Sequence, residues 1–273
     1  MVLRRLTRTR YAQGVQALQA PILRAKTQTL GRDHSTLRRL TSDRRGCSDA
    51  GVGGVTRSPK EQIVLVAERL IADHGVDGVS LRQISAVAGN GNNSAVHYHF
   101  GSKDKLIRAI FEYRLPRLRE RRALLIVERR PSDLRGWLEC QIRAVLEQSE
   151  DDNSNYMSFV ASLYQHGWAA FKNQPKRFIE AQREFEAHLL EHLTHIDEPL
   201  RTHRFFQAMA LIVHAAADRE RARARRRAIL PFAVELGNLL DGMVGFLEAP
   251  VSPTSQAALV DTDSGAFHLT LLV

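Results

Sequence analysis

A short polar segment holds the residues of this chain that are best suited to recognising another molecule. Between Asn92 and Tyr98, asparagine, serine, histidine and tyrosine side chains stand close together. These groups donate and accept hydrogen bonds, and an asparagine amide can pair with adenine through two bonds at once. The candidates for contacts with base edges are Asn92, Asn93, Ser94 and His97, and a wider groove-facing set adds Ala95 and Tyr98.

Residues that could support catalysis or bind a metal are sparse. His188, His192 and His195 stand at i, i+4 and i+7, a spacing that can bind a metal on one helix. No cysteine lies near them, and Glu184 is the only obvious carboxylate on that face, so we favour a solvated or interface face. The sequence has no Ser/His/Asp constellation, phosphate loop or dinucleotide fingerprint. We therefore expect no enzyme activity, no cofactor and no metal, and a helical enzyme or metal-binding protein is the alternative.

Three helices, of which the second and third are short, are predicted to position the polar segment. Serine caps with a glutamate or glutamine three residues later predict the first two starts, and glycines predict their ends. The boundary residues are Ser58, Pro59, Glu61 and Gly75 for the first helix, Ser80, Gln83 and Gly89 for the second, and Asn93 or Ser94 and Phe100 for the third. The third helix is expected to bury Val96 and Phe100 and to present its polar side. This is the plan of a helix-turn-helix, whose third helix enters the major groove of DNA.

Two strings of residues in this region resemble the tetracycline-repressor (TetR) family of bacterial regulators. They are Leu81-Arg82-Gln83-Ile84-Ser85-Ala86-Val87-Ala88-Gly89 and Ser94-Ala95-Val96-His97-Tyr98-His99-Phe100-Gly101-Ser102-Lys103-Asp104-Lys105-Leu106. The family signature is a small-residue and glycine turn, an aromatic-rich third helix, and a Ser-Lys-x-x-Leu start of the fourth helix. The resemblance implies phosphate contacts from Ser80 and Lys103, and a base or phosphate contact from Arg82.

The chain departs from the family pattern at two places. The segment Asn90 to Asn93 looks one residue longer than usual. The aromatic phosphate contact that the family usually has in the middle of the third helix falls on His97, with Tyr98 next to it. The roles of individual residues toward DNA are therefore less defined than the fold.

Prolines and acidic turns divide the rest of the chain into further helices. We expect them at about 103–128, 133–148, 155–171, 175–195, 198–221 and 232–248, with Pro250 and Pro253 ending ordered structure. The predicted fold class is all-α, with about nine helices. The predicted domains are a basic, disordered extension over 1–55, a helix-turn-helix DNA-binding domain over 56–104, a helical ligand-binding and dimerisation domain over 105–249, and a C-terminal tail over 250–273.

The last two of these helices read as a dimer interface. Their apolar residues recur at helical spacing, and two such helices from each subunit can form a four-helix bundle. The residues assigned to this interface are Phe206, Met209, Val213, Leu236, Leu240, Met243 and Leu247. The alternative is that they form a monomer core. We favour a homodimer because a single recognition helix makes too few contacts, and two half-sites multiply the affinity.

Aromatic residues in the middle helices are candidates for a ligand pocket. They are Trp137, Tyr156, Phe159, Tyr164, Trp168 and Phe171, and packing in the core is the alternative for each of them. The family resemblance implies an unknown small-molecule effector that shifts the protein between DNA-competent and DNA-incompetent states. The expected function is a ligand-responsive repressor that acts as a homodimer on a palindromic operator in double-stranded DNA.

Charge and composition agree with a DNA-binding protein. The net charge is +9, distributed as +9 over residues 1–57, +5 over 58–130 and −5 over 131–273. A basic surface confined to one part of a chain suits phosphate binding. Cys47 and Cys140 predict free thiols in a reducing compartment. No apolar run approaches the ~18 residues that cross a membrane, so we expect a cytoplasmic, nucleoid-associated protein.

The first 55 residues admit several readings. They are rich in arginine and poor in acidic residues. A disordered tail is the favoured interpretation, and a basic arm that contacts phosphates is the functional alternative. A translation start further downstream and a transit peptide are the others.

Overall fold

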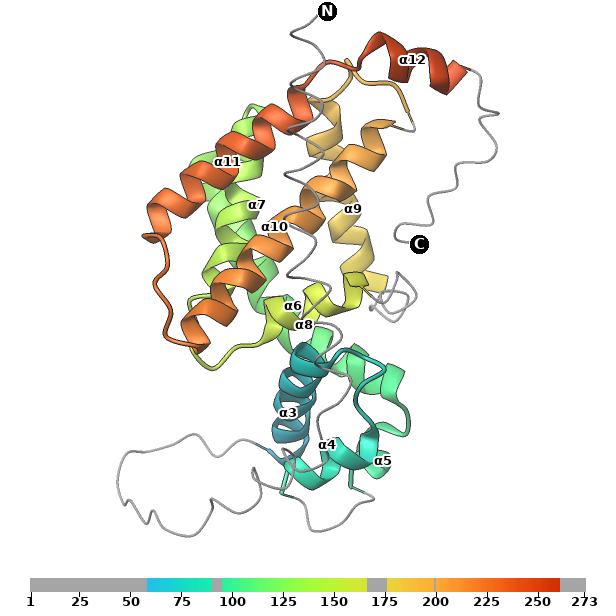
Figure 1. Cartoon of the computed structure of the whole chain (residues 1–273), viewed down its shortest axis with the longest axis vertical. Helices are drawn as coiled ribbons and strands as arrows, with labels where there is room; N and C mark the ends of the chain where they lie inside the picture. Colours follow the sequence, from blue (N-terminus) through green and yellow to red (C-terminus); the bar gives the residue numbers. More distant parts are fainter. Residues whose placement is uncertain (1–57, 90–94, 166–175, 199, 261–273) are drawn as a thin grey trace, which may run out of the picture. The chain divides into compact units, whose positions relative to one another are not determined.

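Every regular element in the described part of the chain is a helix. The structure is a computed structural model that describes residues 58–89, 95–165, 176–198 and 200–260. Within these ranges it contains ten helices and no strand, which confirms the all-α prediction (Figure 1). The helices are α3 (Pro59–His74), α4 (Leu81–Val87), α5 (Ala95–Phe100), α6 (Lys103–Arg129), α7 (Leu134–Gln148), α8 (Tyr156–Gln165), α9 (Lys176–Glu191), α10 (Leu200–Ala224), α11 (Phe232–Glu248) and α12 (Pro253–Val260).

Side-chain caps begin the first two helices, as the sequence predicts. The Ser58 hydroxyl accepts a hydrogen bond from the Glu61 backbone N–H at 3.2 Å, and the Glu61 carboxylate accepts one from the Ser58 N–H at 2.9 Å. Ser80 and Gln83 repeat this capping box at the start of α4. Helix α3 ends at Gly75, whose φ of 76° lies in the left-handed region that glycine adopts without steric cost.

Helix α6 connects the helix-turn-helix to the remaining helices. The Ser102 hydroxyl caps it by accepting a hydrogen bond from the Lys105 N–H at 3.3 Å. Along its 27 residues α6 packs against α3 and α5, and also against α7. Helix α3 also packs against α8, α8 against α10, and α7 against α11 (Figure 1). One continuous cluster of buried apolar residues therefore joins the helix-turn-helix to the body.

Two predicted boundaries prove different in the structure. Pro253 does not end ordered structure but begins α12, because proline is well tolerated in a first helical turn and the Ser252 hydroxyl caps the Ser255 N–H at 3.2 Å. Helix α9 ends at Glu191, before the predicted end at His195. The predictions on residues 1–57 and 166–175 lie outside the described residues.

Candidate nucleic-acid interface

A small apolar core holds α5 against its neighbours. Ile63 of α3, Ile84 of α4, Val96 of α5 and Leu106 of α6 are each completely buried, and Phe100 is 6% exposed. The sequence-based prediction that Val96 and Phe100 form the inner side of the third helix is confirmed. Because α5 has only six residues, these contacts rather than its own hydrogen bonds hold it in place.

The opposite side of α5 carries polar and aromatic residues. His97, Tyr98 and His99 are exposed, and the Tyr98 side chain is 86% exposed. The Tyr98 and His99 rings meet edge to face with centroids 5.3 Å apart. Such a face can donate to phosphate oxygens and to base edges. Arg82 is also exposed, on α4.

The remaining predicted base-contacting residues precede α5. Asn92, Asn93 and Ser94 lie outside the described residues, and Ala95 is the first residue of α5. The departure from the family pattern at Asn90 to Asn93 also falls outside the described residues. Of the predicted set, the structure therefore describes Arg82 on α4 and His97 and Tyr98 on α5, and these two helices pack against each other.

Ser80 and Lys103, the two predicted phosphate contacts, both make hydrogen bonds within the chain. The Ser80 hydroxyl accepts from the Gln83 N–H at 3.2 Å and donates to the Gln83 side-chain oxygen at 2.8 Å. The half-buried Lys103 ammonium donates to the Val76 carbonyl at 2.8 Å. Lys103 therefore ties the connector between α3 and α4 to the start of α6, a role that its sequence position does not reveal.

A buried ion pair joins the helix-turn-helix to the body. The Glu68 carboxylate of α3 accepts two hydrogen bonds from the Arg114 guanidinium of α6, at 2.6 and 2.8 Å, and one from the Asn155 N–H before α8, at 3.0 Å. Glu68 is completely buried and Arg114 is 9% exposed. Although burial lowers the pKa of Arg114, the hydrogen bond and the charge of Glu68 raise it above its ordinary value. Three helices thus meet at one charged contact.

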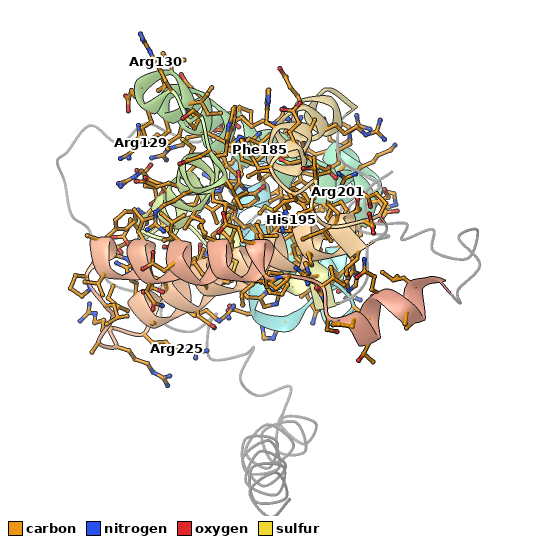
Figure 2. The ribbon with its side chains drawn as sticks, turned by 90° about the horizontal axis from the view of Figure 1, so that it is seen from above. Arg129, Arg130, Phe185, His195, Arg201 and Arg225 are labelled. Atoms are coloured by element: carbon orange, nitrogen blue, oxygen red, sulfur yellow. The ribbon has the colours of Figure 1, made fainter. Side chains whose placement is uncertain are left out.

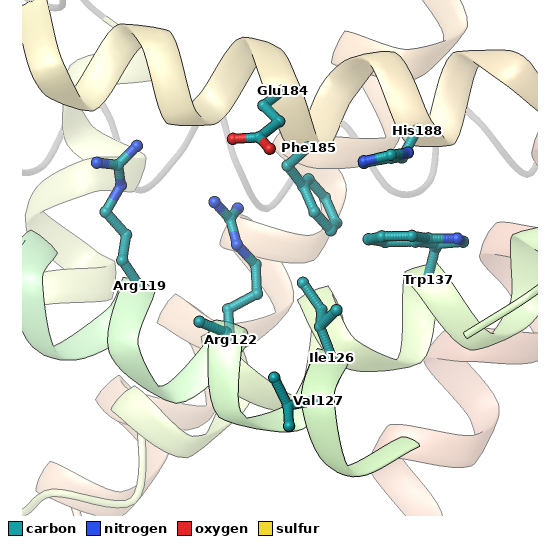
Figure 3. A pocket seen from close by; sticks show the side chains of 9 residues that line it. Arg119, Arg122, Ile126, Val127, Trp137, Glu184, Phe185 and His188 are labelled. Atoms are coloured by element: carbon teal, nitrogen blue, oxygen red, sulfur yellow. The ribbon is translucent and has the colours of Figure 1, made fainter. Parts of the chain in front are cut away.

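A cavity of about 390 Å³ lies between α6, α7 and α9. Its walls combine charged and apolar side chains: Arg119, Arg122, Ala123, Ile126, Val127, Trp137, Glu184, Phe185 and His188. Figure 3 shows Arg119 and Arg122 extending from α6 toward α9, and Trp137 lying flat against His188. The Trp137 and His188 ring centroids are 4.5 Å apart, with 12° between the ring planes. The size is in the range of small-molecule sites.

Only one described residue of the predicted ligand pocket lines this cavity. Trp137 does, whereas Tyr156 and Phe159 are 2% and 0% exposed and pack with Phe111 in the core. Tyr164 meets His214 edge to face with ring centroids 6.0 Å apart and is not among the residues that line the cavity. Trp168 and Phe171 lie outside the described residues. Sequence reasoning selected aromatic residues and could not separate core from lining.

The cavity residues outside the predicted pocket include both charged and apolar side chains. Arg119, Arg122 and Ile126 follow one another at helical spacing on α6, and Glu184, Phe185 and His188 do so on α9. A search for arginines among apolar residues at i+3 and i+4 would have singled out Arg122, which precedes Leu125 and Ile126.

Most of the residues predicted to form the dimer interface are buried within the single chain. Phe206, Met209, Leu236, Leu240, Met243 and Leu247 are between 0% and 7% exposed, and Val213 is half-buried. They pack α10 and α11 against each other and against the body. The alternative interpretation of a monomer core therefore describes their position in this chain, and a partner would have to contact other residues.

The histidine row does not lie on one helix face. Helix α9 ends at Glu191, so His192 and His195 follow it in a turn, while His188 stacks on Trp137. The described residues contain no group of three or more His, Cys, Asp or Glu side chains that could hold a metal ion. Cys140 is a free, buried thiol whose pKa is raised by burial.

Basic side chains are not confined to the helix-turn-helix. Arg129 and Arg130 are exposed at the end of α6, and Arg225 is exposed after α10 (Figure 2). Figure 2 shows Arg225 extending away from the ribbon. None of the helices in the described ranges combines the length and the apolar run that a membrane crossing requires.

Residues 63–110 match the family described as bacterial regulatory proteins, tetR family. The matched segment covers most of α3, all of α4 and α5, and the start of α6. This match confirms the predicted resemblance to the TetR family over the helix-turn-helix segment. No curated protein matches the chain.

The solved structures that this chain resembles are distant from it in sequence. The fatty acid degradation regulator FadR from Bacillus halodurans is 14% identical, covers 71% of this chain and 99% of its own, and has a TM-score of 0.50. A transcriptional regulator from Rhodococcus sp. Rha1 is 19% identical over 70% of this chain and 96% of its own, with a TM-score of 0.45. A TetR-family regulator from Streptomyces coelicolor A3 is 18% identical; the match covers 72% of this chain and 99% of that protein, with a TM-score of 0.33.

Proposed function

We propose that this protein is a ligand-responsive repressor that binds a palindromic operator as a homodimer. The observation that carries the proposal is the geometry of α5, which is held by buried Val96 and Phe100 while His97 and Tyr98 face outward. In this proposal residues 56–104 bind DNA, residues 105–249 bind the effector and the second subunit, and the protein acts in the cytoplasm at the nucleoid. It is a regulator rather than an enzyme.

The proposed base-reading residues are Asn92, Asn93, Ser94 and His97, supported by Ala95 at the start of α5. In this proposal Tyr98 and Arg82 contact phosphates and adjacent bases, since tyrosine and arginine are frequent donors to DNA. The intramolecular hydrogen bonds of Ser80 and Lys103 leave these two residues a positioning role in the proposal. Ser80 remains exposed and close to the DNA-facing helices.

The proposed dimer uses the outer face of α10 and α11. Leu211, Val234 and Phe246 are 52%, 52% and 38% exposed there. A groove of about 430 Å³ is lined by Gln207, Ala210, Leu211, His214 and Phe246. A Cβ added to Gly242 or Gly245 would meet no atom within 4 Å, so a second copy could approach α11 closely. Apolar groups that are exposed next to small residues support a two-fold helix bundle.

The proposed response to a ligand passes through α6. This helix lines the cavity with Arg119, Arg122 and Ile126, and it also packs against α3 and α5. Through Arg114 it holds Glu68 of α3 in the buried ion pair. A ligand that binds better to one placement of α6 would shift the population of DNA-competent dimers.

The proposal is tested with the full chain and duplexes selected from a random pool. We expect recovery of a palindrome whose half-sites lie about 34–36 Å apart, and a steep loss of affinity with salt. Asn93→Ala should change the selected sequence. An equal affinity for selected and random duplexes would refute operator recognition, and an equal loss on every duplex would refute the role of Asn93.

A further inference from the structure

Arg122 differs from the other buried arginines of the described chain. Arg114 is paired with Glu68 at 2.6 Å, and Arg219 is paired with Glu150 at 2.6 Å. Arg122 is 9% exposed, and among the described side chains its guanidinium forms no ion pair. A buried charge that no carboxylate contacts directly is unfavourable, so Arg122 is a position where an anion would be stabilised.

The hydrogen bonds of Arg122 hold its guanidinium at the cavity. One terminal nitrogen, Nη1, donates to the Gln141 side-chain oxygen of α7 at 3.0 Å and to the Gln182 side-chain oxygen of α9 at 3.1 Å. The guanidinium carbon lies 4.2 Å from the centroid of the Phe185 ring. These neutral partners fix the orientation without neutralising the charge. Burial lowers the pKa of Arg122 to about 10, and the charge of Arg119 lowers it too, while Glu184 raises it.

Aromatic and aliphatic side chains form another part of the cavity wall. Trp137 is stacked on His188, and its ring also meets Phe185 edge to face at 5.9 Å. Ile126 and Val127 of α6 add aliphatic surface. Such walls suit a planar apolar group, because aromatic and aliphatic side chains gain contact area without leaving polar atoms unpaired.

We propose that the cavity between α6, α7 and α9 binds an organic carboxylate with a planar apolar body. The carboxylate faces Arg122 and Arg119, and the apolar body lies against Trp137 and Phe185. Guanidinium groups bind carboxylates through paired, charge-assisted hydrogen bonds. Glu184, which also lines the cavity, opposes the anion and tunes its affinity. This inference rests on the proposed ligand-responsive function, because it names the chemical class of the effector.

The test compares 1-naphthoate with its neutral analogue 1-naphthamide on the full chain by titration calorimetry. We expect the acid to bind about ten to one hundred times more tightly than the amide, as hydrogen bonds to charged groups allow. Arg122→Gln should remove most of this preference. Arg108→Gln, which removes a half-exposed arginine from the same helix, should keep it. Equal binding of acid and amide, no binding of the acid at millimolar concentration, or a preference that survives Arg122→Gln would overturn the proposal.

Two exposed positions provide variants that do not disturb the core. Glu184→Gln should strengthen binding of the acid relative to the amide, because it removes the opposing carboxylate. Ala123→Phe adds a ring at the cavity wall and should weaken binding of both compounds. These variants test the proposal even if Arg122→Gln does not fold, which circular dichroism would reveal. Unchanged affinity for the acid in Ala123→Phe would place the ligand elsewhere and overturn the inference.

A parallel DNA-binding assay separates this inference from the proposed function. If the protein binds its operator but binds the acid and the amide equally, the proposed ligand class is wrong and the proposed function stands. If the protein prefers 1-naphthoate to the amide but binds selected and random duplexes with equal affinity, the ligand class is supported and operator recognition is refuted.

Discussion

A buried carboxylate of α10 makes the stability of this protein depend on pH in an unusual direction. Glu220 is 4% exposed, and its carboxylate accepts hydrogen bonds from the Met157 N–H at 3.2 Å and the Ser158 N–H at 2.9 Å at the start of α8. Burial raises the pKa of Glu220 to about 7, and the charge of Glu68 raises it as well. The hydrogen bonds from Ser158 and Met157 act in the opposite direction.

The magnitude follows from the difference between the folded and unfolded proton affinities. The folded chain holds a proton on Glu220 up to pH of about 7, whereas the unfolded chain releases it near the ordinary value of 4.5. The stabilisation from this proton is complete below pH 4.5 and is lost as the pH rises through 7. With about 1.4 kcal/mol per pKa unit, the loss is roughly 3 kcal/mol in all, and roughly 2–3 kcal/mol of it falls between pH 5 and 8.

Urea unfolding of the wild type and Glu220→Gln at constant protein concentration measures this effect. Between pH 5 and pH 8 the wild type should lose roughly 2–3 kcal/mol of unfolding free energy relative to Glu220→Gln, because glutamine does not titrate. Glu248→Gln, at an exposed position at the end of α11, is the matched control and should show a much smaller shift. A constant difference for Glu220→Gln over this range would refute the reasoning that burial outweighs the hydrogen bonds at the start of α8.

Four further changes test other parts of the structure. Arg82→Ala should weaken binding to DNA and reduce the salt slope, which is the slope of log affinity against log salt concentration, by about one. Fluorescence anisotropy at several salt concentrations measures it. Lys103→Ala should lower the unfolding free energy by about 1 kcal/mol while leaving the salt slope unchanged, because its ammonium binds the connector carbonyl. Arg114→Met should cost about 3–5 kcal/mol in urea unfolding, since it leaves a buried carboxylate unpaired. Leu211→Arg should convert the dimer to a monomer in sedimentation velocity, whereas Leu124→Arg, at a side chain of similar exposure on α6, should not.

Each of these expectations has an outcome that contradicts it. An unchanged salt slope in Arg82→Ala would remove this residue from the phosphate contacts. A reduced slope in Lys103→Ala would restore the phosphate contact that the family resemblance implies. A change below about 1 kcal/mol in Arg114→Met would mean that water reaches the carboxylate. Loss of the dimer in Leu124→Arg rather than in Leu211→Arg would place the interface on α6.

The helix-turn-helix could be predicted from sequence because its signals are local. Each signal involves residues only a few positions apart: the capping boxes at Ser58 and Ser80, and the helix end at Gly75. Such signals can be recognised in the sequence alone. The inner side of α5 was also predictable, since Val96 and Phe100 recur at helical spacing. The end of α9 was harder to predict, because His192 and His195 after the helix have the same helix propensity as His188 within it.

The body depends on contacts between distant residues, and there the sequence pattern was ambiguous. Helical periodicity in α10 and α11 correctly marked an apolar side, but a core and a dimer interface have the same periodicity. Packing against α7 and α8 decided that Phe206, Leu240 and Leu247 belong to the core, which left Leu211 and Phe246 exposed.

The sequence by itself predicted the TetR-like helix-turn-helix, the starts of its first two helices and the buried face of α5, because each depends on residues within a turn or two of one another. The tertiary structure decided which charges meet. It paired Glu68 with Arg114, turned Lys103 toward the Val76 carbonyl, and left Arg122 at a cavity wall with neutral partners. Burial and the distance between side chains set the energy of a charge, and both quantities arise only when helices pack.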